Sequence, residues 1–78
     1  MARIEKLKGR WKQICASYKG QRVKIVGDHF AAGRTGTHTG AAKFTQNDMG
    51  HVVLLDASGT LPPSSIVVWK SWHMEFIN

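Results

Sequence analysis

The sequence has little cysteine, little proline and few acidic residues. Its 78 residues include one cysteine, two prolines and five aspartates and glutamates. Because Cys15 has no second thiol to pair with, an internal disulfide is excluded, and so is a zinc site built from several cysteines. No stretch approaches the roughly 18 apolar residues that a membrane span needs. With no apolar signal segment at the start, we expect a reducing, cytoplasmic location.

The composition is that of a small folded domain. Hydrophobic residues make up 42% of the chain and include three tryptophans and three phenylalanines, enough for one compact core. A chain of this length buries only about 60% of its unfolded surface, so a monomer is marginally stable. Self-association is one remedy, and a homo-oligomer therefore stays open as an alternative.

The positive charge is concentrated in the first third of the chain. Residues 1–24 hold eight of the eleven basic residues and one of the five acidic ones, which gives +7 there and −1 in residues 25–78. This asymmetry indicates a polyanionic partner, namely RNA or DNA, an anionic membrane or an acidic protein surface. The alternative is a solvated helix face that only keeps the protein soluble.

Residues 1–20 have the pattern of a basic amphipathic helix. Apolar side chains recur at spacings of three and four, and Gly20 supplies a C-terminal stop. The helix needs a partner for this stripe, either the rest of the chain or a second copy. The stripe consists of Ile4, Leu7, Trp11, Ile14 and Tyr18.

Residues 21–78 have the pattern of short strands linked by turns. Arg22 and Lys24 alternate with Val23 and Ile25, which predicts a strand with one wet face. Four further runs predict strands, the first of them strongly bent by its glycines. They lie in residues 33–45, 51–57, 66–70 and 73–77. We therefore predict a mainly β domain, a small SH3-like barrel of about five antiparallel strands preceded by one N-terminal amphipathic α-helix.

Two of the predicted strands are apolar at every position. Residues 52–55 and 66–69 contain no polar side chain. A sheet with one wet face does not need such runs, so we expect both faces to be covered, by the helix, by barrel closure or by another subunit.

A glycine-rich stretch follows the first predicted strand. Gly27 and Gly33 enclose five residues, Arg34 replaces the lysine of a P-loop, and no helical pattern follows, so a nucleotide-binding P-loop is excluded. Residues 20–40 instead resemble a KOW-type motif, which forms the first hairpin of SH3-like barrels that contact RNA or protein. The matching positions are Gly20, Val23, Ile25, Gly27, Gly33, Gly36 and Thr37, where the family usually has Val.

A second resemblance concerns the C-terminal part of the chain. Residues 65–78 are similar in length and pattern to the last strand region of the type II dihydrofolate reductases, which are tetrameric SH3-like barrels. The pore-lining run of that family corresponds to Ile66-Val67-Val68-Trp69 here. Val67 stands where the family has its amide-bearing glutamine. The resemblance therefore implies the architecture, and we predict that the protein is not an enzyme.

The titratable residues follow no catalytic or metal-binding pattern. The four histidines, His29, His38, His51 and His73, lack metal-ligand spacing, and no carboxylate pair marks an acid/base site. We predict no metal, no catalytic residue and no cofactor. Cys15 lies beside the helix stripe and is expected to be a small, half-buried residue.

Trp69 and Trp72 are three residues apart near the end of the chain. On a regular strand they point in opposite directions, so at most one joins the core and the other lies exposed near Lys70. An exposed tryptophan beside a cation suits base stacking or a protein hot spot. The alternative is that both are buried in the barrel or in a subunit interface.

The combined pattern predicts a small, non-enzymatic protein that associates with nucleic acid through its helix and first hairpin. The alternative is a protein-interaction module or homo-oligomeric accessory protein with an acidic protein partner. A multimeric reductase of the type II kind ranks behind both. The predicted nucleic-acid-binding residues are Lys6, Lys8, Arg10, Lys12, Arg22, Lys24, Arg34, Lys70 and Trp72.

Overall fold

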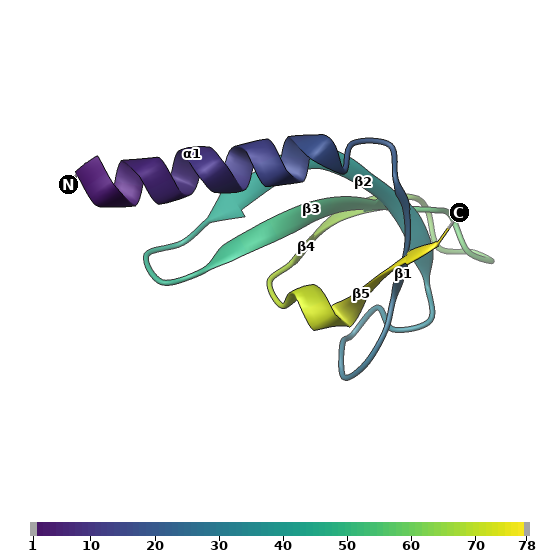
Figure 1. Cartoon of the computed structure of the whole chain (residues 1–78). Coiled ribbons are helices and arrows are strands. Elements are labelled where there is room, and N and C mark those ends of the chain that lie inside the picture. The colour runs from purple at the N-terminus through teal and green to yellow at the C-terminus, as the bar shows by residue number, and fades with distance from the viewer. Residues whose placement is uncertain (1, 78) are drawn as a thin grey trace.

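The computed structural model describes residues 2–77, and from residue 7 onward it describes their side chains as well. One helix is followed by five strands and a short 3-10 helix (Figure 1). The predicted N-terminal helix and mainly β remainder are confirmed. The elements are α1 (Ala2–Ser17), β1 (Arg22–Ile25), β2 (Thr35–Phe44), β3 (Met49–Leu55), β4 (Ser64–Val68), η1 (Ser71–His73) and β5 (Met74–Ile77).

The five strands form one antiparallel sheet in the order β4-β3-β2-β1-β5. β4 and β5 are its two edges, so the sheet is not closed as a barrel. Helix α1 runs along β2 and β3, and its first turns project past the β2–β3 hairpin (Figure 1). In residues 2–77, no helix combines the length and the apolar character that crossing a bilayer demands.

The core lies on one face of this sheet. The predicted alternation of β1 is confirmed, because Val23 and Ile25 are fully buried while Lys24 is exposed. The strand partners and the loop after β1 complete the core, whose buried residues are Val23, Ile25, Ala31, Val53, Leu55 and Val68, with Ile66 and Met74 packed against them.

Strand β2 is irregular in its middle. Its register with β3 shifts between His38 and Ala42, and Gly40 adopts a φ of 84°. A Cβ built on Gly40 would lie 2.7 Å from the Cβ of Lys19, which follows α1. Glycine is therefore required here for two reasons, the left-handed backbone and the close approach of the chain that leaves the helix.

Helix α1 turns a slightly different face to the sheet than its apolar stripe predicts. Trp11 donates a hydrogen bond from Nε1 to the Gly50 carbonyl at 3.1 Å, and Tyr18 packs against Phe76 with ring centres 4.8 Å apart. Cys15 lies between them on the same face and is fully buried, whereas Leu7 and Ile14 are 50% and 36% exposed. Ile4, which the stripe includes, has a side chain outside the described residues.

Within one chain, the two apolar runs are covered on one face and not on both, so cover of the other face by another subunit stays a prediction. Leu54 is 47% exposed and Trp69 is 37% exposed, because β3 and β4 have the core and α1 on one face only. On the other face, the side chains of Val67 and Trp69 fold over Gly50, where an added Cβ would meet them at 2.7 and 2.8 Å. This outer face of β3 and β4 is apolar and partly open to solvent.

Candidate functional site

The predicted binding residues fall into groups with different surroundings. Lys6 has a side chain outside the described residues. Lys8, Arg10 and Lys12, which we call the helix cations, lie on α1. The ammonium groups of Lys8 and Lys12 are 5.8 and 6.0 Å from the centre of the Phe44 ring. Their i, i+4 spacing places both on one side of the helix, next to the end of β2.

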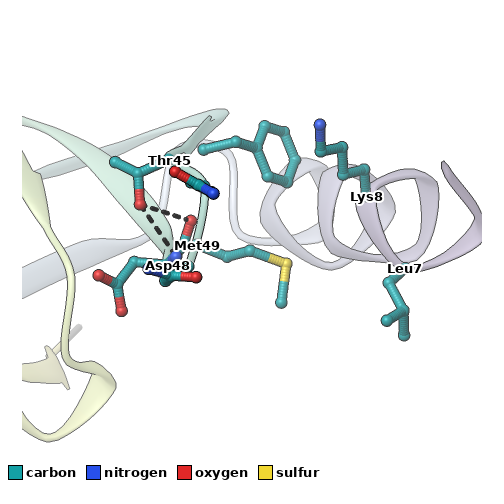
Figure 2. Close-up of a pocket in the computed structure, with 8 residues that line it drawn as sticks. Leu7, Lys8, Thr45, Asp48 and Met49 are labelled. Carbon is teal, nitrogen blue, oxygen red and sulfur yellow. Dashed lines mark hydrogen bonds between the residues drawn. The ribbon is translucent and has the colours of Figure 1, made fainter. Parts of the chain in front are cut away.

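An open pocket lies between Lys8 and the turn that joins β2 to β3 (Figure 2). Leu7, Phe44 and Met49 give it apolar walls. Three hydrogen bonds hold the turn. The Thr45 amide donates to the Asp48 carbonyl at 2.8 Å, and the Asp48 amide donates to Thr45 Oγ1 at 2.9 Å. Thr45 Oγ1 in turn donates to the Asp48 carbonyl at 3.5 Å. Figure 2 shows the Asp48 carboxylate pointing away from Lys8. The pocket thus combines apolar surface with an ammonium group.

Arg22 and Arg34 are in a different situation, because both are bound to Asp56. Arg22 forms a two-pronged ion pair with that carboxylate, with Nη1 2.9 Å from Oδ1, and Arg34 Nη2 donates to the Asp56 carbonyl at 2.7 Å. Thr35 Oγ1 donates to the same carboxylate at 2.9 Å. The hydrogen bonds from Arg22 and Thr35 lower the pKa of Asp56 to about 2. Among the side chains of residues 7–77, this is the one ion pair.

Lys24 is exposed on β1 and sits opposite Glu75 of β5 in the strand register. The face of β1 that was predicted to be wet therefore carries one paired arginine and one exposed lysine. Its available positive charge is smaller than the sequence indicates.

The remaining predicted residues, Lys70 and Trp72, lie at the 3-10 helix η1. Trp72 is 71% exposed, and the ammonium of Lys70 lies 5.7 Å from the centre of its ring. Burial of both tryptophans within the chain is wrong, since Trp69 is also partly exposed, while their burial in a subunit interface stays a prediction. The strand alternation used for this pair does not apply, because η1 begins between the two residues and breaks the period of two.

The structure also brings together three buried side chains that the sequence spacing did not connect. Cys15 of α1, His38 of β2 and His51 of β3 are each at most 2% exposed, and their ligand-type atoms all lie within 4.8 Å of one another. The prediction of a half-buried Cys15 is wrong, because the thiol faces the sheet. It lies 3.9 Å from His51 Nδ1.

The hydrogen bonds define the proton positions on the two histidines. The Gly40 amide donates to His38 Nδ1 at 2.9 Å, so the proton of neutral His38 is on Nε2. That Nε2 donates to His51 Nδ1 at 3.0 Å, which leaves the His51 proton on Nε2, facing Ser71 Oγ at 3.2 Å. A second proton on either ring would oppose another donor, so both rings are held neutral.

Burial reinforces this neutrality. Loss of solvent lowers the pKa of His51 to about 4, with a smaller contribution from neighbouring His38, and it also lowers the pKa of His38. Burial raises the pKa of the Cys15 thiol. The cluster is therefore a neutral polar group inside the protein, and Ser71 links it to the surface.

The inward orientation of two members of this cluster could be predicted from the sequence. His51 alternates with Val53 and Leu55, so it shares their inward face. Cys15 lies four residues after Trp11, on the same side of the helix. Nothing in the sequence, however, gives the register that sets His38 beside His51, and Phe44 carried no signal as a partner of the helix lysines.

Comparisons of the chain with protein-family models, with curated proteins and with solved structures give no match. The function is therefore argued from the side chains themselves.

Proposed function

We propose that the protein is a small, non-enzymatic nucleic-acid-binding protein that contacts its ligand through the helix cations and the adjoining pocket. One observation carries the proposal: the ammonium groups of Lys8 and Lys12 converge on Phe44 without a carboxylate partner among the side chains of residues 7–77. Arg10 adds a third, exposed cation on the same helix.

Cations without a carboxylate partner in residues 7–77 favour a phosphate backbone as ligand. Each phosphate that a lysine neutralises releases condensed counterions, and this release supplies most of the affinity of sequence-independent binding. Contact with the Phe44 ring holds both ammonium groups near one place, which reduces the side-chain entropy lost on binding.

The pocket beside Lys8 favours nucleic acid over other polyanions. Its apolar walls, Leu7, Phe44 and Met49, offer a surface on which a base can pack while its phosphates meet the lysines. Trp72 with Lys70 supplies a second exposed aromatic ring beside a cation, which suits stacking of an unpaired base. The preferred ligand is therefore single-stranded.

We also propose a more specific fold and a cellular location for the protein. Five short antiparallel strands with β1 between β2 and β5, together with the bent β2, support an SH3-like barrel with an incompletely closed sheet. The KOW-like glycines lie in its first hairpin. A single cysteine, buried and unpaired, supports a cytoplasmic, reducing location.

A second candidate function is self-association, which the outer face of β3 and β4 favours. Leu54, Val67 and Trp69 lie on this face, and Leu54 and Trp69 are more than a third exposed. An apolar sheet face of this kind is suited to pairing with a second copy. Such an oligomer survives high salt and dissociates on dilution, so light scattering over a concentration series checks it.

A binding titration tests the proposed function. Fluorescence anisotropy of short labelled RNA and DNA, single- and double-stranded, is followed at several salt concentrations, with inorganic polyphosphate as the matched polyanion without bases. We expect single strands to bind best, with an affinity that falls steeply with salt, and polyphosphate to compete weakly. No binding of any strand at low salt would contradict the proposal. Equal binding of polyphosphate would show that bases play no part.

A further inference from the structure

We propose that Cys15, His38 and His51 form a buried binding site for one divalent transition-metal ion of the zinc class. The site is separate from the helix cations, and the inference does not depend on the proposed function. A thiolate and two imidazoles are ligands that select zinc and related ions over magnesium or calcium.

The ligand atoms are already close to the required geometry. His38 Nε2 and His51 Nδ1 are 3.0 Å apart, and Cys15 Sγ is 3.9 Å from His51 Nδ1. Tetrahedral zinc, with Zn–N near 2.1 Å and Zn–S near 2.3 Å, needs about 3.4 Å between two nitrogens and about 3.6 Å between nitrogen and sulfur. The nitrogen pair must therefore open by about 0.4 Å, and the sulfur must move about 0.3 Å closer to His51 Nδ1. The third pair, Cys15 Sγ and the His38 nitrogen, lies within 4.8 Å and must close by at most about 1.2 Å.

Three separate elements present these ligands without a solvent shell. α1 supplies the thiol, while β2 and β3 supply the imidazoles, and the three residues are at most 2% exposed. His51 also has the orienting contact that a metal-bound histidine normally has, because Ser71 Oγ accepts the proton of its outer nitrogen at 3.2 Å.

Metal binding has a defined proton balance. The ion displaces the thiol proton of Cys15, and one proton leaves the protein. His51 keeps its tautomer, since its Nδ1 lone pair already points into the cluster. His38 must move its proton from Nε2 to Nδ1, with no net release, so that Nε2 can coordinate.

This tautomer change has a consequence at Gly40. Its amide donates to His38 Nδ1 in the metal-free protein, and two N–H groups would face each other in the loaded one. The Gly40 amide must therefore turn away. It lies at the register shift of β2 and has the positive φ that glycine tolerates, so the backbone has freedom to do so.

Cobalt(II) titration of the full chain, reduced and freed of metal by a chelator, tests the site. We expect one ion per chain, with a water as the fourth ligand, the visible bands of a tetrahedral complex and a near-ultraviolet thiolate-to-cobalt charge-transfer band, all removed by zinc. Because Cys15 is the single cysteine, this band identifies it as a ligand without any variant. Absence of the band would overturn the proposal. Cobalt bound without it would indicate other ligands, such as the half-buried pair His29 and His73, whose rings are 5.5 Å apart.

Two further measurements address the histidines in a protein that folds normally. Ser71→Ala removes the contact to His51 at an exposed position and should weaken cobalt affinity about 10-fold or more. Ser65→Ala, an exposed serine of β4, is the matched control and should leave it unchanged. In amide NMR spectra, zinc should shift the Gly40 signal strongly. A Ser71→Ala affinity equal to that of the control, or an unmoved Gly40 signal, would contradict the three-ligand site.

Discussion

The helix cations carry the same charge as Arg22 of β1 and Arg34, which precedes β2; we call these two the sheet arginines. The two groups differ in whether a carboxylate of the protein already binds them. Lys8 and Lys12 are near an aromatic ring, whereas Arg22 and Arg34 are both bound to Asp56. A phosphate reaching Arg22 must compete with a carboxylate that is already in place. The comparison teaches that the charge available to a ligand depends on pairing as well as on sequence.

Strand register explains the difference. Gly36 pairs with Leu55, and the Asp56 amide then donates to the Thr35 carbonyl at 3.0 Å, which brings the carboxylate over β2 and toward β1. The turn beside α1 contains Asp48, but its carboxylate points away from Lys8 (Figure 2). Asp56 therefore neutralises Arg22, while Lys8 and Lys12 have no carboxylate partner among the side chains of residues 7–77.

The largest expected effect is a loss of stability in the sheet beneath α1, which supports the helix cations. His38→Ala leaves a cavity, and it leaves the Gly40 amide and His51 Nδ1 without their partner. We expect the free energy of unfolding to fall by about 3 kcal/mol. His29→Ala is the matched control, because His29 Nδ1 also accepts an amide two residues on, from Ala31, but is only half-buried. Denaturant unfolding measures both, and equal losses would contradict the importance of burial.

A smaller effect concerns the helix cations directly. Lys12→Glu should weaken oligonucleotide binding about 10-fold at low salt, because it replaces a phosphate contact by repulsion. Lys24→Glu makes the same change in net charge on β1, opposite Glu75, and should cost less than about 3-fold. Anisotropy titrations compare the two. A greater loss for Lys24→Glu would move the binding surface to the sheet.

A weaker effect on binding is expected when Arg22 is released from its ion pair. Asp56→Asn removes the ion pair of Arg22, so we expect affinity for nucleic acid to rise about 2-fold while the melting temperature falls. Glu75→Gln is the control with the same gain in net charge. If both variants bind alike, the ion pair does not withhold Arg22 from the ligand.

The smallest effect is the acid titration of this ion pair. The pKa of Asp56 is about 2 in the folded protein and 3.8 in the unfolded chain. Its contribution to stability is therefore complete above pH 3.8 and is lost as the pH falls toward 2. Denaturant unfolding across this range should show a loss that Asp56→Asn lacks. An equal loss in the variant would assign it to other carboxylates.

The sequence predicted the elements better than their contacts. Local patterns were sufficient for α1 and for β1, since spacing and alternation act between near neighbours. The pairing of Arg22 with Asp56 spans 34 residues, and that of His38 with His51 spans 13. Such contacts depend on strand register and on the bulge at Gly40, which no local pattern specifies.

The errors at the helix and at the tryptophans have local physical causes. Helix α1 is rotated so that Cys15 faces the sheet in place of Ile14, because Trp11 and Tyr18 already define that side. Trp72 escapes the strand alternation because η1 interrupts the extended chain.

The salt dependence of binding in two matched double variants tests the central claim, that the helix lysines and not the sheet arginines bind phosphate. Lys8→Gln/Lys12→Gln and Arg22→Gln/Arg34→Gln each remove two positive charges, so the change in net charge is the same. For a single strand, the slope of log affinity against log salt should fall by about 0.7 per lost contact, about 1.4 in all, in the lysine variant. The arginine variant should keep the slope of the unmodified protein. A slope reduced in the arginine variant and kept in the lysine variant would contradict the account.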